Sequence, residues 1–300
     1  MFTGCGTALV TPFRRDGSLD EAAIRRLVRR QIDAGINFVC PCGTTGESPT
    51  LTRQEHLRTV EITLEEAKGK VPVVAGAGGY NTSEVIVLVR ELAAMGVDGI
   101  VSVSPYYNKP TQEGLYQHYK AIAEATALPI VLYSVQSRAS VNIEAATVKR
   151  LAEIDTIVGI KEASGNIAQM GAILNSAPAS FDVLSGDDAM TLPLMALGGR
   201  GVISVASNEA PAEMTRLARL CNEGNFAEAR ALHRRLLPLM DANFIETNPM
   251  PVKAAMGLMG LLEPVWRLPL VPPKPETLAR LQSVLESLGM VERLHAAARN

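Results

Sequence analysis

The feature that most constrains this chain is a regular alternation of short apolar runs with longer amphipathic segments. Eight runs rich in β-branched or other apolar residues occur at positions 7–10, 38–40, 71–75, 99–103, 129–133, 157–161, 182–185 and 201–205. Between them, apolar residues recur at helical spacing, as in Ile24, Val28 and Ile32. Near-continuous apolar strands separated by helices are typical of a parallel sheet that helices cover.

The ends of the expected helices are marked by polar caps and glycines. Residues 18–21 and 52–55 have the form of capping boxes, and residues 81–84 resemble a third helix start. Gly35 and Gly96 each follow a helical run and precede a strand, where a left-handed residue commonly ends a helix. Strand and helix are therefore predicted to alternate along the chain.

Eight such units predict an α/β fold of the (β/α)8, or TIM barrel, type. An open doubly wound sheet is disfavoured because no GxGxxG motif follows the first strand. From about Pro211 onward the pattern is helical only, with candidate helices at 226–244, 250–262 and 275–288. We therefore predict a catalytic barrel at residues 1–210 and a C-terminal helical extension at residues 211–300.

Composition narrows the class of function. The hydrophobic content is 47%, and a formal net charge of -2 gives no basic surface for nucleic acid or anionic membranes. Neither a signal peptide nor a membrane-spanning run is recognisable, so a cytoplasmic location is expected. The four cysteines do not form a disulfide framework and are interpreted as reduced thiols. The four histidines lack metal-ligand spacing and no GxSxG motif occurs, so we expect neither metal nor cofactor.

Polar residues at the carboxyl ends of barrel strands are the candidates for catalysis. Lys161 ends an apolar strand, where desolvation would lower the pKa of its ammonium and favour a nucleophilic amine that forms an imine with a carbonyl. A structural ion pair with Glu162 explains the local sequence equally well. Tyr133 ends the preceding strand and could relay protons, although a half-buried structural tyrosine is the commoner case. Residues 43–47 offer hydroxyls and backbone N–H groups that suit a small carboxylate, or they form only a turn.

These motifs together resemble a known family. Residues 43–47 (GTTGE), 104–110 (SPYYNKP) and 159–164 (GIKEAS), with Tyr133 followed by Arg138, are similar to the dihydrodipicolinate synthase family. That family lies within the superfamily of pyruvate-dependent class I aldolases and N-acetylneuraminate lyases. The resemblance covers nearly the whole chain and implies a lyase that condenses pyruvate with L-aspartate 4-semialdehyde in lysine (diaminopimelate) biosynthesis.

The resemblance also implies roles for residues on the pyruvate side. Lys161 would form the imine with pyruvate, and Tyr133 would shuttle protons. Thr44 would link Tyr133 to Tyr107, which a neighbouring subunit contributes. Thr45 would hold the pyruvate carboxylate.

On the acceptor side, Arg138 would bind the carboxylate of the semialdehyde, and the backbone near Gly186 and Ile203 would line the pocket. The loop at residues 134–140 (SVQSRAS) departs from the family pattern, which has a proline and a threonine flanking the arginine. Two alternatives stay open because of it. Besides the synthase, one is a related 2-oxo-acid aldolase or lyase for another aldehyde, and the other is a degenerate barrel that binds pyruvate or an amino acid without turnover.

The resemblance finally implies a homotetramer built as a dimer of dimers, and a lysine inhibitor at a subunit interface. His56, Glu84 and Tyr106 match positions that bind the inhibitor in the family, whereas Arg53 and Tyr80 replace its usual histidine and asparagine. Feedback control by lysine is therefore an open question at this point.

Overall fold

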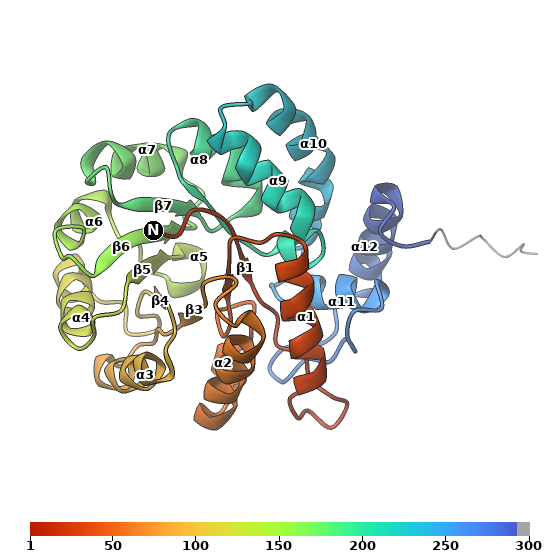
Figure 1. Ribbon diagram of the computed structural model, residues 1–300, viewed down its shortest axis with the longest axis horizontal. Helices are drawn as coiled ribbons and strands as arrows, with labels where there is room; N and C mark the ends of the chain where they lie inside the picture. Colours follow the sequence, from red (N-terminus) through yellow and green to blue (C-terminus); the bar gives the residue numbers. More distant parts are fainter. Residues whose placement is uncertain (293–300) are drawn as a thin grey trace, which may run out of the picture.

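A computed structural model describes residues 1–292, which form a barrel of eight parallel strands surrounded by helices (Figure 1). The strands are β1 (Gly4–Ala8), β2 (Phe38–Cys40), β3 (Val74–Gly76), β4 (Gly99–Val103), β5 (Ile130–Ser134), β6 (Ile157–Glu162), β7 (Asp182–Ser185) and β8 (Gly201–Ser204). Strand β1 pairs with both β2 and β8, and a parallel bridge between Val39 and Val73 joins β2 to the start of the β3 segment. The predicted (β/α)8 barrel is confirmed.

Each predicted strand overlaps an observed one, with ends that differ by a few residues. The starts of two strands differ most and equally, since β1 begins at Gly4 rather than at residue 7 and β3 begins at Val74 rather than at residue 71. The N–H of Gly4 donates to the carbonyl of Arg200 at 2.9 Å, so pairing with the segment of β8 already begins there. Pairing with a strand nearly 200 residues away is not visible in the local apolar pattern.

Helices follow the strands and cover the outside of the barrel. They are α1 (Glu21–Asp33), α2 (Arg53–Ala67), α3 (Thr82–Met95), α4 (Gln112–Glu124), α5 (Gln136–Ala139), α6 (Ala145–Leu151), α7 (Ile167–Ser176), α8 (Thr191–Ala196), α9 (Pro211–Asn222), α10 (Phe226–Ala242), α11 (Met250–Leu258) and α12 (Pro275–Leu288). Short 3-10 turns occur at Ser48–Thr50, Asp188–Met190 and Ala206–Asn208. The candidate helices at 226–244 and 250–262 thus end earlier than predicted.

Helices begin at all three predicted starts, but only one of the two predicted capping boxes forms. Thr52 caps α2 in a complete capping box, and the side chain of Asn81 accepts from the N–H of Ser83 at the start of α3. Residues 18–21 do not form a capping box. The side chain of Asp20 caps α1 instead, because the hydroxyl of Ser18 is taken by the carboxylate of Asp16 at 2.6 Å.

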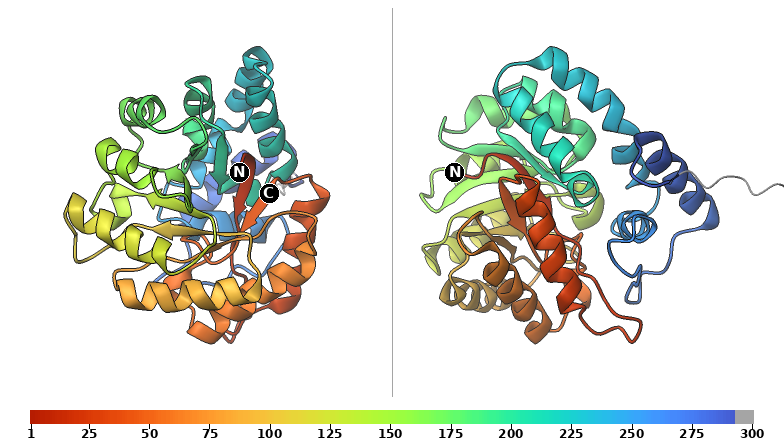
Figure 2. Two further views of the ribbon diagram at one scale, coloured as in Figure 1. Left: turned by 60° about the vertical axis from the view of Figure 1, so that its left-hand side comes forward. Right: turned by 45° about the vertical axis from the view of Figure 1, so that its right-hand side comes forward.

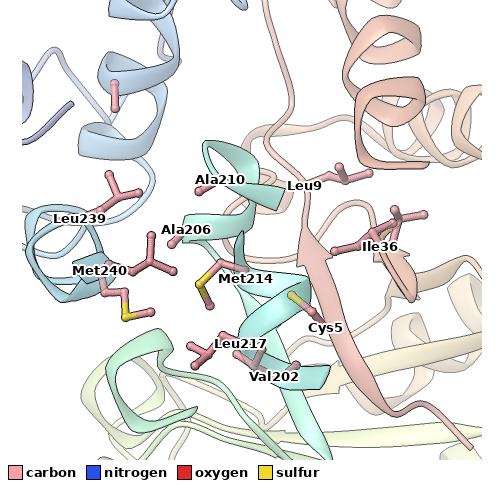
Figure 3. Packing of buried hydrophobic residues seen from close by; sticks show 14 of the residues in the cluster. Cys5, Leu9, Ile36, Val202, Ala206, Ala210, Met214, Leu217, Leu239 and Met240 are labelled. Atoms are coloured by element: carbon pink, nitrogen blue, oxygen red, sulfur yellow. The ribbon is translucent and has the colours of Figure 1, made fainter. Parts of the chain in front are cut away.

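The largest hydrophobic cluster joins the barrel to the C-terminal helices. Figure 3 shows Met214 and Leu217 of α9 between Val202 of β8 and the α10 residues Leu239 and Met240. Helix α9 packs on β1 and β8, and is therefore the helix of the eighth βα unit. Helices α10 and α12 then pack on each other.

Helices α11 and α12 lie on the opposite side of the molecule from the N-terminus (Figure 2, right). The division between a barrel at residues 1–210 and an extension beyond it stays a prediction, and residues 293–300 of that extension lie outside the described residues. In the described part of the chain, no helix is both long and apolar enough to cross a bilayer.

Candidate active site

The carboxyl ends of β5 and β6 bring Tyr133 and Lys161 together at one mouth of the barrel. The two residues pair in register on neighbouring strands, and the Lys161 Nζ lies 4.2 Å from the centroid of the Tyr133 ring. Lys161 is only 6% exposed and Tyr133 only 7% exposed. An amine in this setting keeps little of its hydration, as a nucleophile for a carbonyl requires.

The structural alternative for Lys161 was an ion pair with Glu162. Within residues 1–292 the carboxylate of Glu162 instead accepts from the N–H of Ser164 at 3.3 Å and from Nε2 of Gln169 at 2.9 Å. Burial raises the pKa of Glu162, and no ion pair within 4.0 Å joins it to Lys161 among the described residues. The side chains of Lys161 and Glu162 follow the alternation of a strand and face opposite sides of β6.

Two cavities meet at Lys161 and Tyr133, which line both of them. The first, which we call the Thr44 cavity, is also lined by residues that include Cys40, Gly43, Thr44, Val103, Tyr106 and Ile203. The second, the Arg138 cavity, is also lined by residues that include Thr45, Arg138, Gly186, Asp187, Phe244 and Asn248. The predicted pyruvate and acceptor residues therefore surround one reactive centre.

The loop from residue 43 to residue 47 is held by its own backbone and by the barrel. The N–H of Gly46 donates to the carbonyl of Gly43 at 3.1 Å, and the hydroxyl of Thr11 donates to the carbonyl of Gly46 at 2.7 Å. The hydroxyl of Thr45 accepts from Nδ2 of Asn248 at 3.0 Å. This loop is thus a fixed platform beside Lys161 rather than an open turn.

Gly186 lies where any larger residue would collide with the centre. A Cβ atom at this position would come within 2.6 Å of the Ala163 Cβ and 3.2 Å of the Lys161 Cε. The absence of a side chain therefore keeps the stem of Lys161 in place and leaves the Arg138 cavity open.

These observations place the chain among known proteins. A sequence model described as the dihydrodipicolinate synthetase family matches residues 1–288. The chain belongs to this family. A relative from Koribacter versatilis named 4-hydroxy-tetrahydrodipicolinate synthase is 52% identical over 98% of each chain.

Solved structures of the family superpose closely on this chain. Dihydrodipicolinate synthase from Thermotoga maritima has a TM-score of 0.95 and 47% identity, and the match covers 97% of this chain and 100% of that one. The enzyme from Cyanidioschyzon merolae with lysine bound has a TM-score of 0.93 and 39% identity, over 97% of this chain and 99% of that one. The resemblance inferred from the motifs is confirmed.

One predicted residue lies away from the centre formed by this single chain. Tyr107 is 90% exposed, has a left-handed backbone with a φ of 69°, and lines neither cavity. That Tyr107 enters the site of a neighbouring subunit stays a prediction.

The expected inhibitor residues are partly brought together. His56 and Tyr106 line the Thr44 cavity, whereas Glu84 lies on the surface outside it. Burial lowers the pKa of His56 to about 4, with help from the charge of Arg53, so its imidazole is neutral at pH 7. The rings of Tyr106 and Tyr80 pack edge to face, with 5.3 Å between the two centroids.

Sequence reasoning missed Asn248, which contacts both sides of the site. Besides its bond to Thr45, its backbone carbonyl accepts from Nη2 of Arg138 at 2.9 Å. The only local signal was the pair of prolines at 249 and 251, which marks the start of α11. Nothing in that signal indicates contact with a loop about two hundred residues earlier.

Proposed function

We propose that this chain is a lyase that condenses pyruvate with L-aspartate 4-semialdehyde to give 4-hydroxy-tetrahydrodipicolinate in lysine (diaminopimelate) biosynthesis. The observation that carries the proposal is the position of Lys161, a buried amine where two cavities meet. Thr44 lines one cavity, and Thr45 and Arg138, the residues that would bind the two substrate carboxylates, line the other. Curated relatives about 50% identical to this chain bear the name of this synthase.

The proposed reaction begins when the Lys161 amine attacks the ketone carbon of pyruvate and a water molecule is lost. The resulting imine gives up a proton from the pyruvate methyl group and becomes an enamine. The enamine carbon then bonds to the aldehyde carbon of the second substrate, whose oxygen takes up a proton. Finally the amino group of that substrate attacks the imine carbon, closes the ring and releases Lys161. The balance is one pyruvate and one semialdehyde to one product and one water.

The proposed roles of the other residues follow their places around the centre. Tyr133 relays the protons, assisted by Thr44 at the wall of the same cavity. Thr45 holds the pyruvate carboxylate, and Arg138 offers a planar guanidinium for the carboxylate of the semialdehyde. Gly186 and Ile203 shape the pocket.

We also propose a cytoplasmic homotetramer, a dimer of dimers, in which Tyr107 enters the site of a neighbouring subunit. The exposure of Tyr107 supports this assignment, because tyrosines are enriched at protein–protein interfaces and this one is 90% exposed in the single chain. Lysine is proposed as an inhibitor that binds near His56, Glu84 and Tyr106. The support is the lysine-bound relative, together with the two of these residues that line the Thr44 cavity.

A panel of aldehydes assayed with pyruvate tests the proposed function. We expect L-aspartate 4-semialdehyde to give the highest kcat/KM, with release of the cyclic product measured directly by mass spectrometry. The panel should include succinate semialdehyde, which lacks the amino group and so cannot close the ring. A higher kcat/KM for another aldehyde, or binding of pyruvate without turnover of any of them, would refute the proposal.

A further inference from the structure

Glu47 and Lys253 form a fully enclosed ion pair between the 43–47 loop and α11. The Lys253 Nζ lies 2.5 Å from Oε1 of Glu47, and neither side chain has any exposed surface. The N–H of Arg267 donates to the other carboxylate oxygen at 3.5 Å. The ring of Phe13 covers the pair, with its centroid 4.3 Å from the Lys253 Nζ. Among the ion pairs of residues 1–292, no other has both side chains so completely enclosed.

Such a pair is poorly explained by stability alone. Taking two charges out of water opposes folding, and apolar residues of similar volume often replace a buried ion pair without loss of stability. Burial lowers the pKa of Lys253 to about 8, even though Glu47 acts to raise it. The two ends of the pair lie on different segments, the 43–47 loop and α11.

The Glu47 end fixes the loop that carries Thr44 and Thr45. Glu47 is the last residue of that loop and has a left-handed backbone with a φ of 54°, which is uncommon for a residue with a side chain. Its N–H donates to the carbonyl of Thr44 at 3.1 Å. Anchoring the carboxylate therefore fixes the backbone on which both threonines depend.

The Lys253 end fixes the start of α11. The N–H of Lys253 donates to the carbonyl of Pro249 at 3.1 Å, so the lysine lies one turn after Pro249, the residue that follows Asn248. Asn248 contacts Thr45 through its side chain and Arg138 through its carbonyl. The residue just before α11 thus bridges the residues proposed to hold the two substrate carboxylates.

We propose that the Glu47–Lys253 ion pair is a positioning device, which locks the 43–47 loop to α11 so that Asn248 holds Thr45 and Arg138 at a fixed separation. The inference rests on the proposed function and extends it to two residues outside the site. Neither Glu47 nor Lys253 lines the Thr44 cavity or the Arg138 cavity. Both are therefore positioning residues that act through Thr45 and Arg138.

Variants that remove the charges but keep the volumes test this proposal: Glu47→Gln alone, and Glu47→Gln together with Lys253→Met. A displacement of about 1 Å can slow an enzyme on the order of 10²-fold. We therefore expect both variants to lower kcat/KM for each substrate by about tenfold or more, mainly through a higher KM. Borohydride trapping of pyruvate on Lys161 should persist. The double variant should recover Tm relative to the single variant without recovering KM.

The exposed pair Arg15–Glu263 is a control, since it also joins a loop after a barrel strand to the C-terminal helical region, here the β1–α1 loop to the chain after α11. Arg15→Met with Glu263→Gln should leave both KM values unchanged. Wild-type KM values in the folded double variant would overturn the positioning role, as would KM values that recover together with Tm. If the double variant does not fold, the KM values of Glu47→Gln alone are compared with those of the wild-type chain. A wild-type chain that is not trapped by pyruvate refutes the proposed function instead, whatever the variants do.

Discussion

Lys161 presents its amine to the face of the Tyr133 ring, 4.2 Å from the centroid, from the register-paired position on the next strand. Each residue is the last but one of its strand, so the register of the β5–β6 ladder fixes their backbones beside each other. The backbone positions of the pair are therefore set by the barrel itself, whereas the residues around it depend on loops and on α11.

We predict that pyruvate and borohydride add one covalent label per chain, on Lys161. Lys253 is the other lysine that pyruvate could label, because it is also buried and burial lowers its pKa to about 8. It lines neither cavity, however. Peptide mapping of the reduced adduct distinguishes the two. Lys161→Met should abolish the label, and a label found on Lys253 would contradict the assignment of the nucleophile.

Removal of the Tyr133 hydroxyl should slow turnover by roughly 10²-fold, the usual scale for a lost proton-transfer group. Tyr133→Phe keeps the ring beside Lys161, so the fold and the pyruvate label should persist. Tyr116→Phe is the control, because this tyrosine of α4 packs its ring against the Arg150 guanidinium and lines neither cavity. It should keep its kcat and change the free energy of unfolding by less than about 0.5 kcal/mol. Steady-state rates and urea unfolding of both variants provide the comparison.

Thr44→Val tests the second proton-relay residue in the same way. The substitution keeps the shape of the side chain but removes its hydroxyl, so kcat should fall by on the order of 10²-fold while Tm changes little. Thr63→Val is a suitable control, because the Thr63 hydroxyl donates to the carbonyl of Thr59 one turn earlier in α2 and lies outside both cavities. Equal rates in the two variants would remove Thr44 from the relay.

The sequence was informative where structure follows from local pattern. Strand positions, the capping box at Thr52 and the barrel could be predicted, because apolar periodicity and caps act within a few residues. The capping box expected at Ser18 was wrong for an equally local reason, since the Ser18 hydroxyl donates to Asp16 and Asp20 caps α1 instead. The strand-end positions of Lys161 and Tyr133 were also readable, although their roles came from the resemblance and stay predictions.

What could not be predicted depends on contacts between distant parts of the chain. Asn248 bonds to Thr45 across 203 residues, and Lys253 pairs with Glu47 across 206. A lysine on an amphipathic helix is usually solvated, so the sequence around Lys253 does not predict a buried ammonium. Only the packing of α11 against the 43–47 loop reveals that its ammonium is buried.

Subunit contact makes a prediction for Tyr107. If a neighbour receives this tyrosine, Tyr107→Phe and Lys161→Ala chains damage different sites in a mixed oligomer. Mixing the two inactive variants should then restore part of the activity, because some sites receive an intact copy of both residues. Light scattering or native mass spectrometry verifies that mixed oligomers form. Failure to complement in verified mixtures would place Tyr107 outside a shared site.

The free energy of unfolding should depend on pH through the Glu55 carboxyl. A hydrogen bond from Arg267 lowers the pKa of this carboxyl from 4.5 to about 2 in the folded chain, despite partial burial. A depressed folded pKa means that the stabilisation is fully present above about pH 4.5 and is lost as the pH falls toward 2. Glu55→Gln should therefore cost roughly 1–2 kcal/mol at pH 7 after allowance for solvent screening, and clearly less at pH 3. Urea unfolding at both pH values measures this, with Glu263→Gln as the exposed control; an equal loss at both values would contradict it.

The loop at 134–140 gives a prediction for the acceptor side. Gln136 is the first residue of α5, two positions before Arg138. Ser134, two positions before Gln136, is held by its hydroxyl, which accepts from the N–H of Ile143 at 3.1 Å. Proline is well accepted at the first position of a helix, where no intrahelical N–H bond is lost. Gln136→Pro should therefore restrict the turn that carries Arg138 and stabilise the chain by about 0.4–1 kcal/mol.

The functional consequence of Gln136→Pro should be confined to one substrate. A stiffer turn aims the Arg138 guanidinium more consistently at the carboxylate of the semialdehyde, so kcat/KM for that substrate should rise while KM for pyruvate stays constant. Ala145→Pro makes the same change at the first position of α6, outside both cavities, and should add stability without altering either constant. Steady-state kinetics with each substrate varied in turn provide the measurement. An unchanged or lower kcat/KM for the semialdehyde in a stabilised Gln136→Pro variant would contradict this prediction. It would mean that the bond from Arg138 to the Asn248 carbonyl already orients the guanidinium without a proline.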